Sequence, residues 1–317
     1  MKRNENMGGC RILLRVCTYA AAIWLAGASI AVAQTQSYPV KPIRVVVPLA
    51  PGGGNDILAR FFAKQVTESV GQQVIVENRP GGGGLVGGEY VARAAPDGYT
   101  LVFGGSGLLV VTLTYRKLDM LKDFTPISPV GEYASLLVVH PSLPVKSVAE
   151  LIRFAKARPG QLNYGSAGTG SAGHLVIEMF RVRAGLDMVH VPYKGAGPAL
   201  TEVMAGQVSL LFSNPLGSAA LVKAGRLRPL AVSGTRRIAI MPDVPTVAES
   251  GLPGFNSTFF LGVLGPAGLP RDIVMRLNSE TQKAIHRRDS QEWFATQGID
   301  ALGGTPEEFT TRIRTDI

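Results

Sequence analysis

The fold is decided by the stretch Ile43-Arg-Val-Val-Val-Pro-Leu-Ala-Pro-Gly-Gly-Gly-Asn-Asp56 and the residues that follow it. Residues 43–47 form a short run rich in β-branched side chains, which predicts a buried strand. Residues 48–55 predict a turn, and residues 56–70 carry apolar side chains at helical spacing until Gly71 ends the helix. A strand, a glycine-rich turn and a helix in this order are typical of an α/β protein.

The same alternation of strand and helix continues through most of the chain. Further strands are predicted at residues 74–76, 99–103, 162–164, 188–191, 208–212 and 227–232. Further helices are predicted at residues 85–95, 148–157, 172–183 and 198–205. The alternation predicts an α/β fold whose sheets are mostly parallel and flanked by helices.

Two extended apolar segments depart from this pattern, residues 127–140 and residues 255–264. Neither is followed directly by a helix of the preceding kind, and we interpret them as two crossings between lobes. The expected organisation is a first lobe of residues 38–133 and 256–317 and a second lobe of residues 134–255. A ligand cleft is expected between the lobes.

Four glycine-rich loops each stand between a predicted strand and a predicted helix. They are residues 51–56, 79–84, 166–171 and 193–198. Glycine allows a ligand to approach backbone N–H groups closely, and a helix N-terminus adds unsatisfied donors and positive potential. Such loops attract carboxylates or phosphates, so the sequence predicts capture of a small anion. The 79–84 loop is equally well interpreted as a tight turn without a ligand.

The first 33 residues have the pattern of a secretory signal peptide. Basic residues precede an apolar stretch that ends in Ala31-Val32-Ala33, which predicts cleavage before Gln34. The alternative is an uncleaved membrane anchor, against which the small residues at the boundary and the polar residues beyond it argue. No later apolar run approaches the roughly 20 residues of a transmembrane helix, so a soluble periplasmic protein is expected.

Charge and cysteine content narrow the classes of function. The 317-residue chain has a formal net charge of +9, and removal of the signal leaves 28 Lys and Arg against 22 Asp and Glu. The basic residues are dispersed and are not interleaved with aromatic residues, which argues against binding of nucleic acid. Both cysteines, Cys10 and Cys17, lie in the predicted signal, so no disulfide, thiol nucleophile or cysteine metal site is expected in the mature chain.

Motifs typical of enzymes are incomplete. Residues 168–173 match G-x-G-x-x-G, but no acid follows the next strand to bind a ribose, which argues against a dinucleotide site. No P-loop motif is present, and Ser171 misses the nucleophile elbow because Thr169 occupies the first glycine position. The histidines are scattered without acidic companions, so neither a metal site nor a cofactor is predicted.

Two side chains at the loops have both a functional and a structural interpretation. His174 lies one turn into the helix that Ser171 opens. It either faces the anion or holds the 166–171 loop through a side-chain–backbone hydrogen bond. Asp56 is interpreted as an acid that satisfies N–H groups at the helix start. The rigid start then presents neighbouring N–H groups to a ligand.

Together these residues resemble the Bug (Bordetella uptake gene) family, periplasmic solute-binding proteins of tripartite tricarboxylate transporters. The resemblance runs from Tyr38 to about Phe309. Its ordered motifs are Tyr38-Pro-Val-Lys-Pro-Ile-Arg44, Pro48-Leu-Ala-Pro-Gly-Gly-Gly-Asn-Asp56, Val76-Glu-Asn-Arg-Pro-Gly81, Ala95-Pro-Asp-Gly-Tyr-Thr100, Lys122-Asp-Phe-Thr-Pro-Ile127, Tyr164-Gly-Ser-Ala-Gly-Thr-Gly-Ser171, Val191-Pro-Tyr-Lys-Gly195, Pro242-Asp-Val-Pro-Thr246 and Thr305-Pro-Glu-Glu-Phe309. Each motif alone is weak, whereas the ordered set is specific. One departure is Ser213, which stands where the family often has an acid.

The resemblance implies a two-lobed Venus-flytrap fold that closes on a small organic carboxylate and does not transform it. It implies membrane subunits of a tripartite tricarboxylate-type transporter as partners, and a monomer is expected. In the family, loops of both lobes grip the ligand through backbone amides, hydroxyls and ordered waters. The expected ligand-binding residues are Pro51, Gly52, Gly53, Gly54, Asn55, Asp56, Ser106, Ser166, Gly168, Thr169, Gly170, Ser171, His174, Tyr193, Gly195 and Ala196.

Two other functions stay open at this point. One is presentation of the ligand to a sensor kinase by a protein of the same fold. The alternative of a different class is a secreted α/β enzyme, either a hydrolase or a dehydrogenase. A receptor releases its ligand unchanged, whereas an enzyme converts it.

Overall fold

The computed structural model describes residues 38–317, so the predicted signal peptide and its cleavage site lie outside the described residues. The strands are β1 (Ile43–Val47), β2 (Val74–Asn78), β3 (Thr100–Gly105), β4 (Phe124–Ala134), β5 (Leu136–Val139), β6 (Asn163–Ser166), β7 (Val189–Pro192), β8 (Leu210–Ser213), β9 (Arg228–Val232), β10 (Thr258–Pro266) and β11 (Asp300–Ala301). The helices are α2 (Gly54–Val70), η1 (Gly82–Gly84), α3 (Leu85–Ala92), α4 (Ser106–Tyr115), α5 (Val148–Lys156), α6 (Ala172–Ala184), α7 (Ala196–Met204), α8 (Pro215–Lys223), α9 (Arg271–His286), α10 (Arg288–Gln297) and α11 (Pro306–Asp316).

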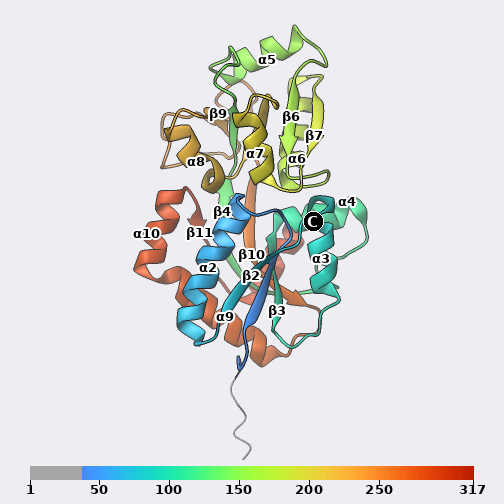
Figure 1. Cartoon of the computed structure of the whole chain (residues 1–317), viewed down its shortest axis with the longest axis vertical. Helices are drawn as coiled ribbons and strands as arrows, with labels where there is room; N and C mark the ends of the chain where they lie inside the picture. The colour runs from blue at the N-terminus through green and yellow to red at the C-terminus, as the bar shows by residue number, and fades with distance from the viewer. Residues whose placement is uncertain (1–37) are drawn as a thin grey trace, which may run out of the picture. The chain divides into compact units, whose positions relative to one another are not determined.

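The first sheet contains β1 and has the strand order β11-β4-β10-β3-β1-β2 within residues 38–317. Val45, Val46 and Val47 of β1 are fully buried, because β-branched side chains pack well on a pleated surface covered on both faces. In Figure 1, α2, α9 and α10 lie on one side of this sheet and α3 and α4 on the other. We call this sheet and its helices lobe 1.

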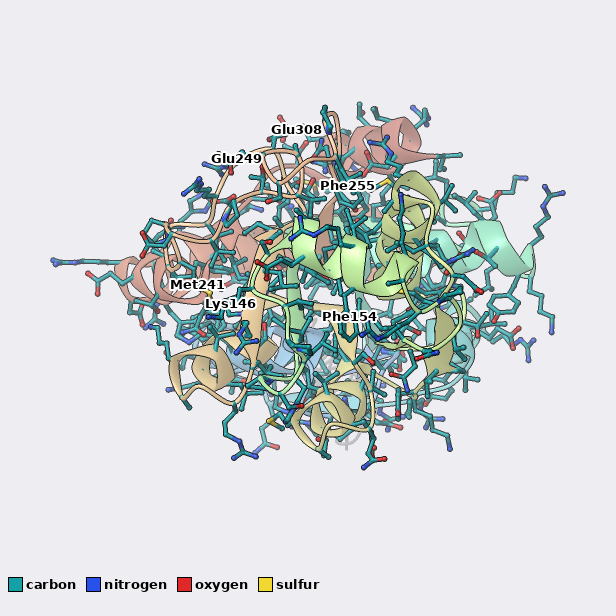
Figure 2. All side chains as sticks on the ribbon, turned by 90° about the horizontal axis from the view of Figure 1, so that it is seen from above. Lys146, Phe154, Met241, Glu249, Phe255 and Glu308 are labelled. Carbon is teal, nitrogen blue, oxygen red and sulfur yellow. The ribbon has the colours of Figure 1, made fainter. Side chains whose placement is uncertain are left out.

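The second sheet has the order β7-β6-β8-β5-β9 within the described residues. Its core contains the fully buried Leu136 and Val138 of β5 together with Leu200 of α7. Helices α6 and α7 both pack on β6 and β8. Helix α5 lies at the end of the molecule farthest from lobe 1 (Figure 1). Figure 2 looks down on that end, where the Arg158 guanidinium lies 4.0 Å from the ring centre of Phe154. We call this sheet and its helices lobe 2.

Both sheets are mixed, which corrects the expectation that they are mostly parallel. In lobe 1, β1 pairs in parallel with β2 and β3, whereas β10 runs antiparallel to β3 and β4. In lobe 2, β6 pairs in parallel with β7 and β8, whereas β5 runs antiparallel to β8 and β9. The antiparallel strands β5 and β10 adjoin the crossings between lobes. They are not connected to their neighbours by βαβ units, so the strand–helix alternation contains no signal for their direction.

The predicted α/β elements are present, with ends within three residues of the expected ones. Helix α7 begins at Ala196, two residues before the predicted start at Pro198. Gly195 is its N-cap. No helix was predicted at α4, α8, α9, α10 or α11. Helix α4 is apolar on every side, so it lacks the amphipathic period on which helix prediction depends.

Ser233 joins the two segments through which the chain passes between the sheets. Its amide donates to the Ser135 carbonyl and its Oγ accepts from the Ser135 amide, both at 2.8 Å. The same Oγ donates to the Ser257 carbonyl at 2.6 Å, and the Ser257 amide donates to the Ser233 carbonyl at 2.8 Å. One fully buried serine therefore holds both crossings side by side.

No helix within residues 38–317 combines the length and the apolar character needed to cross a membrane.

Candidate functional site

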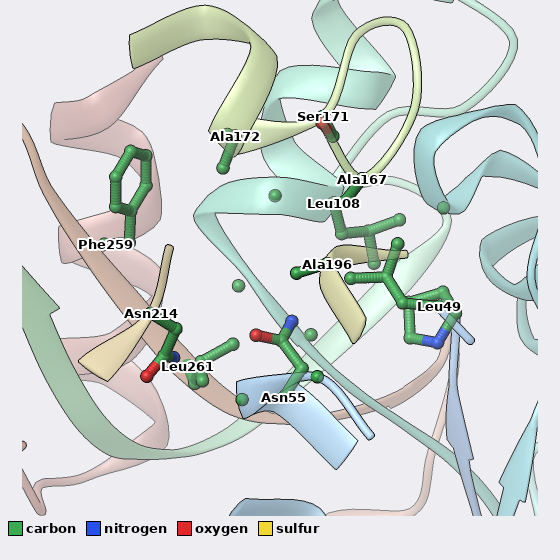
Figure 3. Close-up of a pocket in the computed structure, with 18 of the residues that line it drawn as sticks. Leu49, Asn55, Leu108, Ala167, Ser171, Ala172, Ala196, Asn214, Phe259 and Leu261 are labelled. Atoms are coloured by element: carbon green, nitrogen blue, oxygen red, sulfur yellow. The ribbon is translucent and has the colours of Figure 1, made fainter. Parts of the chain in front are cut away.

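A cavity of about 70 Å³ lies between lobe 1 and lobe 2 (Figure 3). The N-terminal ends of five helices line it: Gly54 of α2, Gly107 of α4, Ala172 of α6, Ala196 of α7 and Asn214 at the start of α8. The first N–H groups of a helix lack partners inside the helix, and the helix dipole adds positive potential there. Five helix starts around one small cavity therefore favour a bound anion.

Two asparagine side chains add polar groups to this cavity. Asn55 extends from the first turn of α2 into the pocket (Figure 3). Asn214 is only 7% exposed, and its Oδ1 accepts from the Leu216 amide at 2.9 Å as the N-cap of α8. The Asn214 Nδ2 has no hydrogen-bond partner among the described residues. A buried donor without a partner is costly, so an acceptor on a ligand would satisfy it.

Charge at the cavity comes from the backbone rather than from basic side chains. Asp56 is the only charged side chain among the described residues that line it. Tyr133 lies at the same wall, and burial raises the pKa of its phenol to about 12. The phenol is therefore a neutral group at neutral pH.

The remaining wall is apolar. Leu49, Leu108, Phe259 and Leu261 come from lobe 1 and surround the polar groups (Figure 3). Such a wall suits the hydrocarbon part of a small organic acid, because burial of apolar surface is favourable.

The lobe-1 loop, residues 51–56, is held by a carboxylate. Asp56 is the third residue of α2, not its N-cap, because the helix begins two residues earlier than predicted. Its Oδ2 accepts from the Gly52 amide at 3.0 Å and from Arg60 Nε at 3.1 Å, and its Oδ1 accepts from Asn78 Nδ2 at 2.9 Å. Burial raises the pKa of Asp56, but the hydrogen bonds from Arg60, Gly52 and Asn78 outweigh it and hold the pKa below its usual value.

The lobe-2 loop, residues 166–171, is held by hydroxyls and imidazoles. Ser171 is the N-cap of α6, and its Oγ accepts from the His174 amide at 3.3 Å. The Gly170 amide donates to His174 Nδ1 at 3.3 Å. The Gly168 amide donates to Ser166 Oγ at 3.1 Å, and this hydroxyl lies 2.7 Å from His190 Nε2.

The two lobes also contact each other directly. The Ala50 amide of lobe 1 donates to the Lys194 carbonyl of lobe 2 at 2.9 Å. The Tyr115 hydroxyl of lobe 1 donates to the Thr169 carbonyl at 3.2 Å. A Cβ at Gly195 would lie 2.8 Å from the Ala50 nitrogen, so this glycine permits the close approach of the lobes. The structure is a closed arrangement.

Among residues 38–317, no group of three or more His, Cys, Asp or Glu side chains is placed to hold a metal ion. The cavity contains backbone donors, amides and hydroxyls around a neutral interior. This arrangement is suited to binding rather than to acid–base or nucleophilic chemistry.

The family described as "Tripartite tricarboxylate transporter family receptor" matches residues 58–315. The chain belongs to this family. Its relatives include protein BugT of Bordetella pertussis, which is 36% identical over 294 residues, covering 90% of this chain and 89% of BugT. The family and the fold are those of solute-binding receptors, not of enzymes, which removes the hydrolase and dehydrogenase alternatives.

Solved structures of similar proteins share the whole described fold. Rpa4515 of R. palustris, solved with adipate, is 35% identical with a TM-score of 0.85, and the match covers 88% of this chain and 95% of Rpa4515. MatC (Rpa3494) of Rhodopseudomonas palustris, solved with bound malate, is 30% identical with the same TM-score, covering 88% of this chain and 97% of MatC. The family resemblance inferred from the motifs is thus confirmed.

The residues predicted from the sequence fall into three groups in this receptor. Gly53, Gly54, Asn55, Asp56, Ser171 and Ala196 line the cavity. Gly168, Thr169 and Tyr193 line a second pocket of about 520 Å³, and Pro51 and Gly52 line a third of about 380 Å³. The others, Ser106, Ser166, Gly170, His174 and Gly195, are engaged in contacts within the protein.

Ser106 and His174 illustrate this last group. Ser106 Oγ accepts from the Phe260 amide at 3.0 Å, so it joins β10 to the start of α4. His174 accepts from the Gly170 amide, which agrees with the structural interpretation of this side chain.

Sequence reasoning missed Asn214, Tyr133 and the apolar wall. For Asn214 a local signal existed, because Asn214-Pro215 directly follows the strand at Leu210–Ser213. Asparagine before a proline at the first helical position is typical of a helix start. Tyr133 and Phe259 carried no such signal, because they reach the cavity only through the pairing of β4 with β10.

Proposed function

We propose that this receptor captures a small organic carboxylate outside the cytoplasm and delivers it to the membrane subunits of a tripartite tricarboxylate-type transporter. The single observation that carries the proposal is the convergence of five helix N-termini on a cavity without a basic side chain. Backbone dipoles and N–H groups neutralise a carboxylate there. The adipate and malate in the structures of Rpa4515 and MatC support this class of ligand.

The candidate contacts are the lobe-1 loop, the lobe-2 loop and Asn214. Asn55 and the amides at the start of α2 would bind the anion from lobe 1, and Ser171 and the start of α6 from lobe 2. Asn214 Nδ2 would donate from the wall of the cavity. Tyr193 and Thr169 line the pocket of about 520 Å³, where they would contact a ligand during entry.

Binding would require hinge motion. A cavity of about 70 Å³ is well below the ~150 Å³ that accommodates benzene, so a four-carbon diacid needs a wider cleft than this closed arrangement provides. We place the hinge at the crossings joined by Ser233, which gives lobe 1 as residues 38–133 and 256–317 and lobe 2 as residues 134–255. Two short crossings allow rotation while each core stays rigid.

A screen of mono-, di- and tricarboxylates by thermal shift tests the proposal, with malate and adipate included and amines as controls. A ligand that binds the folded state raises the melting temperature. Mass spectrometry of the recovered ligand should show it unchanged. A chemically altered ligand, or stabilisation by amines alone, would contradict the receptor function.

Location and partners are tested separately. N-terminal sequencing of the exported protein should begin at Gln34, and a protein that begins at Met1 would exclude cleavage there. Light scattering should give the mass of a monomer. Copurification with the membrane subunits of the transporter, rather than with a sensor kinase, would identify the partner.

A further inference from the structure

Two histidines of lobe 2 lie face to face behind the lobe-2 loop. The ring centres of His174 and His190 are 4.1 Å apart with an angle of 24° between the planes. The Tyr164 ring is stacked next to His190 at 5.0 Å and 15°. His190 and His174 are far apart in the sequence, and β7 and α6 bring them together only in the fold.

Each histidine holds one part of the lobe-2 loop. A backbone amide is only a donor, so the Gly170 N–H requires a free lone pair on His174 Nδ1. His174 is therefore the neutral tautomer with its proton on Nε2. His190 acts one step away, because its Nε2 positions Ser166 Oγ, which accepts from the Gly168 amide.

The same loop supports closure of the lobes. The Thr169 carbonyl lies between Gly168 and Gly170 and accepts from the Tyr115 hydroxyl of lobe 1. Release of the two flanking amides would free this carbonyl to move. The histidines thus influence both the helix start that faces the cavity and a contact between the lobes.

The charged groups around the pair act in opposite directions on an added proton, and burial opposes it. Glu178, on the same helix as His174, is bound by Arg181 at 2.8 Å and accepts from the Tyr164 hydroxyl. The Glu178 carboxylate favours a charge on His174 and on His190, Arg181 opposes a charge on His174, and Asp187 acts on Arg181. Across the loop, α4 contributes the uncharged Tyr115. Burial lowers the pKa of both imidazoles, to about 4 for His190, where His174 lowers it further.

We propose that His174 and His190 are positioning residues for the lobe-2 loop and that His174 holds the Gly170 amide only while its imidazole is neutral, so that acid releases the loop. Protonation of Nδ1 replaces the acceptor with a donor, and the Gly170 amide then faces another N–H. The proposal concerns the protein without ligand and does not depend on the identity of the carboxylate.

The first test needs no variant. A proton–nitrogen correlation spectrum of the imidazoles at about pH 7.5 should show the His174 proton on Nε2 and none on Nδ1. On acidification below about pH 6.5, the Gly170 amide resonance should shift with the same midpoint as the His174 ring. A proton on Nδ1 at neutral pH, or a Gly170 amide that does not follow the His174 ring, would overturn the proposal.

The second test uses His174→Gln, whose side-chain carbonyl accepts a hydrogen bond and does not titrate. The acid-dependent shift of the Gly170 amide should be lost in this variant. The matched control is His140→Gln. The Nδ1 atom of His140 also accepts a backbone amide, that of Ser142 at 3.2 Å, but His140 does not line the cavity. The control should keep the wild-type shift at Gly170. A shift that persists in His174→Gln would contradict the proposal.

Discussion

The lobe-1 loop and the lobe-2 loop perform the same task with opposite chemistry. Both present a helix start to one cavity. The lobe-1 loop is held by the ionised Asp56, which accepts from Gly52, Arg60 and Asn78. The lobe-2 loop is held by His174 and by His190 through Ser166. One loop needs a charge on its supporting residue, and the other needs a charge to be absent.

The difference has a consequence for the response to acid. Asp56 keeps its charge below its usual pKa because its hydrogen bonds outweigh the effect of burial. The histidines lie in surroundings that disfavour a proton. At a pH low enough to protonate His174 but not Asp56, the lobe-1 loop stays intact while the lobe-2 loop loses an acceptor. The two walls of one site therefore have different stabilities.

The largest effect is expected for Asp56→Ala. The substitution leaves Gly52 N–H, Arg60 and Asn78 without their acceptor at a residue that is 4% exposed. The free energy of unfolding should fall by about 3 kcal/mol, because Gly52 N–H and Asn78 lose a charged acceptor, whereas the half-exposed Arg60 guanidinium is hydrated again. Urea denaturation measures it. Asp56→Asn, which keeps one acceptor, should lose less, and equal losses in both variants would show that the hydrogen-bond network is not the cause.

Asn214→Asp should weaken carboxylate binding by about 100-fold, because it replaces the unpartnered Nδ2 donor with a negative charge facing the anion. Aspartate keeps the N-cap of α8, so stability should change little. Calorimetry with malate or adipate, whichever stabilises the wild type, measures the affinity. Asn214→Ala, which removes the donor without adding charge, should lose about tenfold. An unchanged affinity in both variants would remove Asn214 from the site.

The glycines of the two loops should respond differently to a β-branched residue. Gly170 has a φ of +77°, and an added Cβ would lie 3.1 Å from the Tyr115 ring, so Gly170→Val should cost about 2 kcal/mol of stability. Gly53 has a φ of −86°, so Gly53→Val is not strained. There the Cβ would be in ordinary contact with the Gly197 nitrogen of lobe 2 at 3.4 Å, and the further methyl groups of valine would hinder closure. Urea denaturation measures the loss of stability, and small-angle scattering with ligand measures closure of the lobes. Equal stabilities of the Gly170→Val and Gly53→Val variants would contradict the expected difference.

The smallest effect is the dependence of stability on pH. A histidine whose pKa is lowered in the folded state stays neutral there while the unfolded chain takes up a proton. Its contribution to stability is complete above about pH 6.5 and declines as the pH falls below that value. Asp56 has a lowered pKa, so its contribution is complete above about pH 3.9 and declines only as the pH falls further. Urea midpoints from neutral pH to about pH 5 should therefore fall in the wild type and fall less in His174→Gln. An identical pH dependence of the urea midpoint in the wild type and in His174→Gln would contradict this expectation.

Much of the site was predictable because its groups are backbone groups. Gly53, Asn55 and Ser171 lie where a turn after a strand leads into a helix, and local rules for helix starts identify them. The histidine pair, the wall at Phe259 and the contact of Tyr115 with Thr169 join residues far apart in the chain. No local pattern encodes such contacts, and several glycines predicted to admit a ligand instead admit the opposite lobe.

By itself the sequence determined the strand–turn–helix units, the glycine-rich helix starts and the family, because all three depend on residues that are neighbours in the chain. The tertiary structure decided the antiparallel course of β5 and β10, the convergence of five helix starts on one cavity and the unpartnered Nδ2 of Asn214. These features depend on how the two sheets pack and where their edges meet. Packing of distant segments decides which hydrogen-bond donors are buried from water and which side chains take up a proton. Both properties govern ligand binding in this cavity.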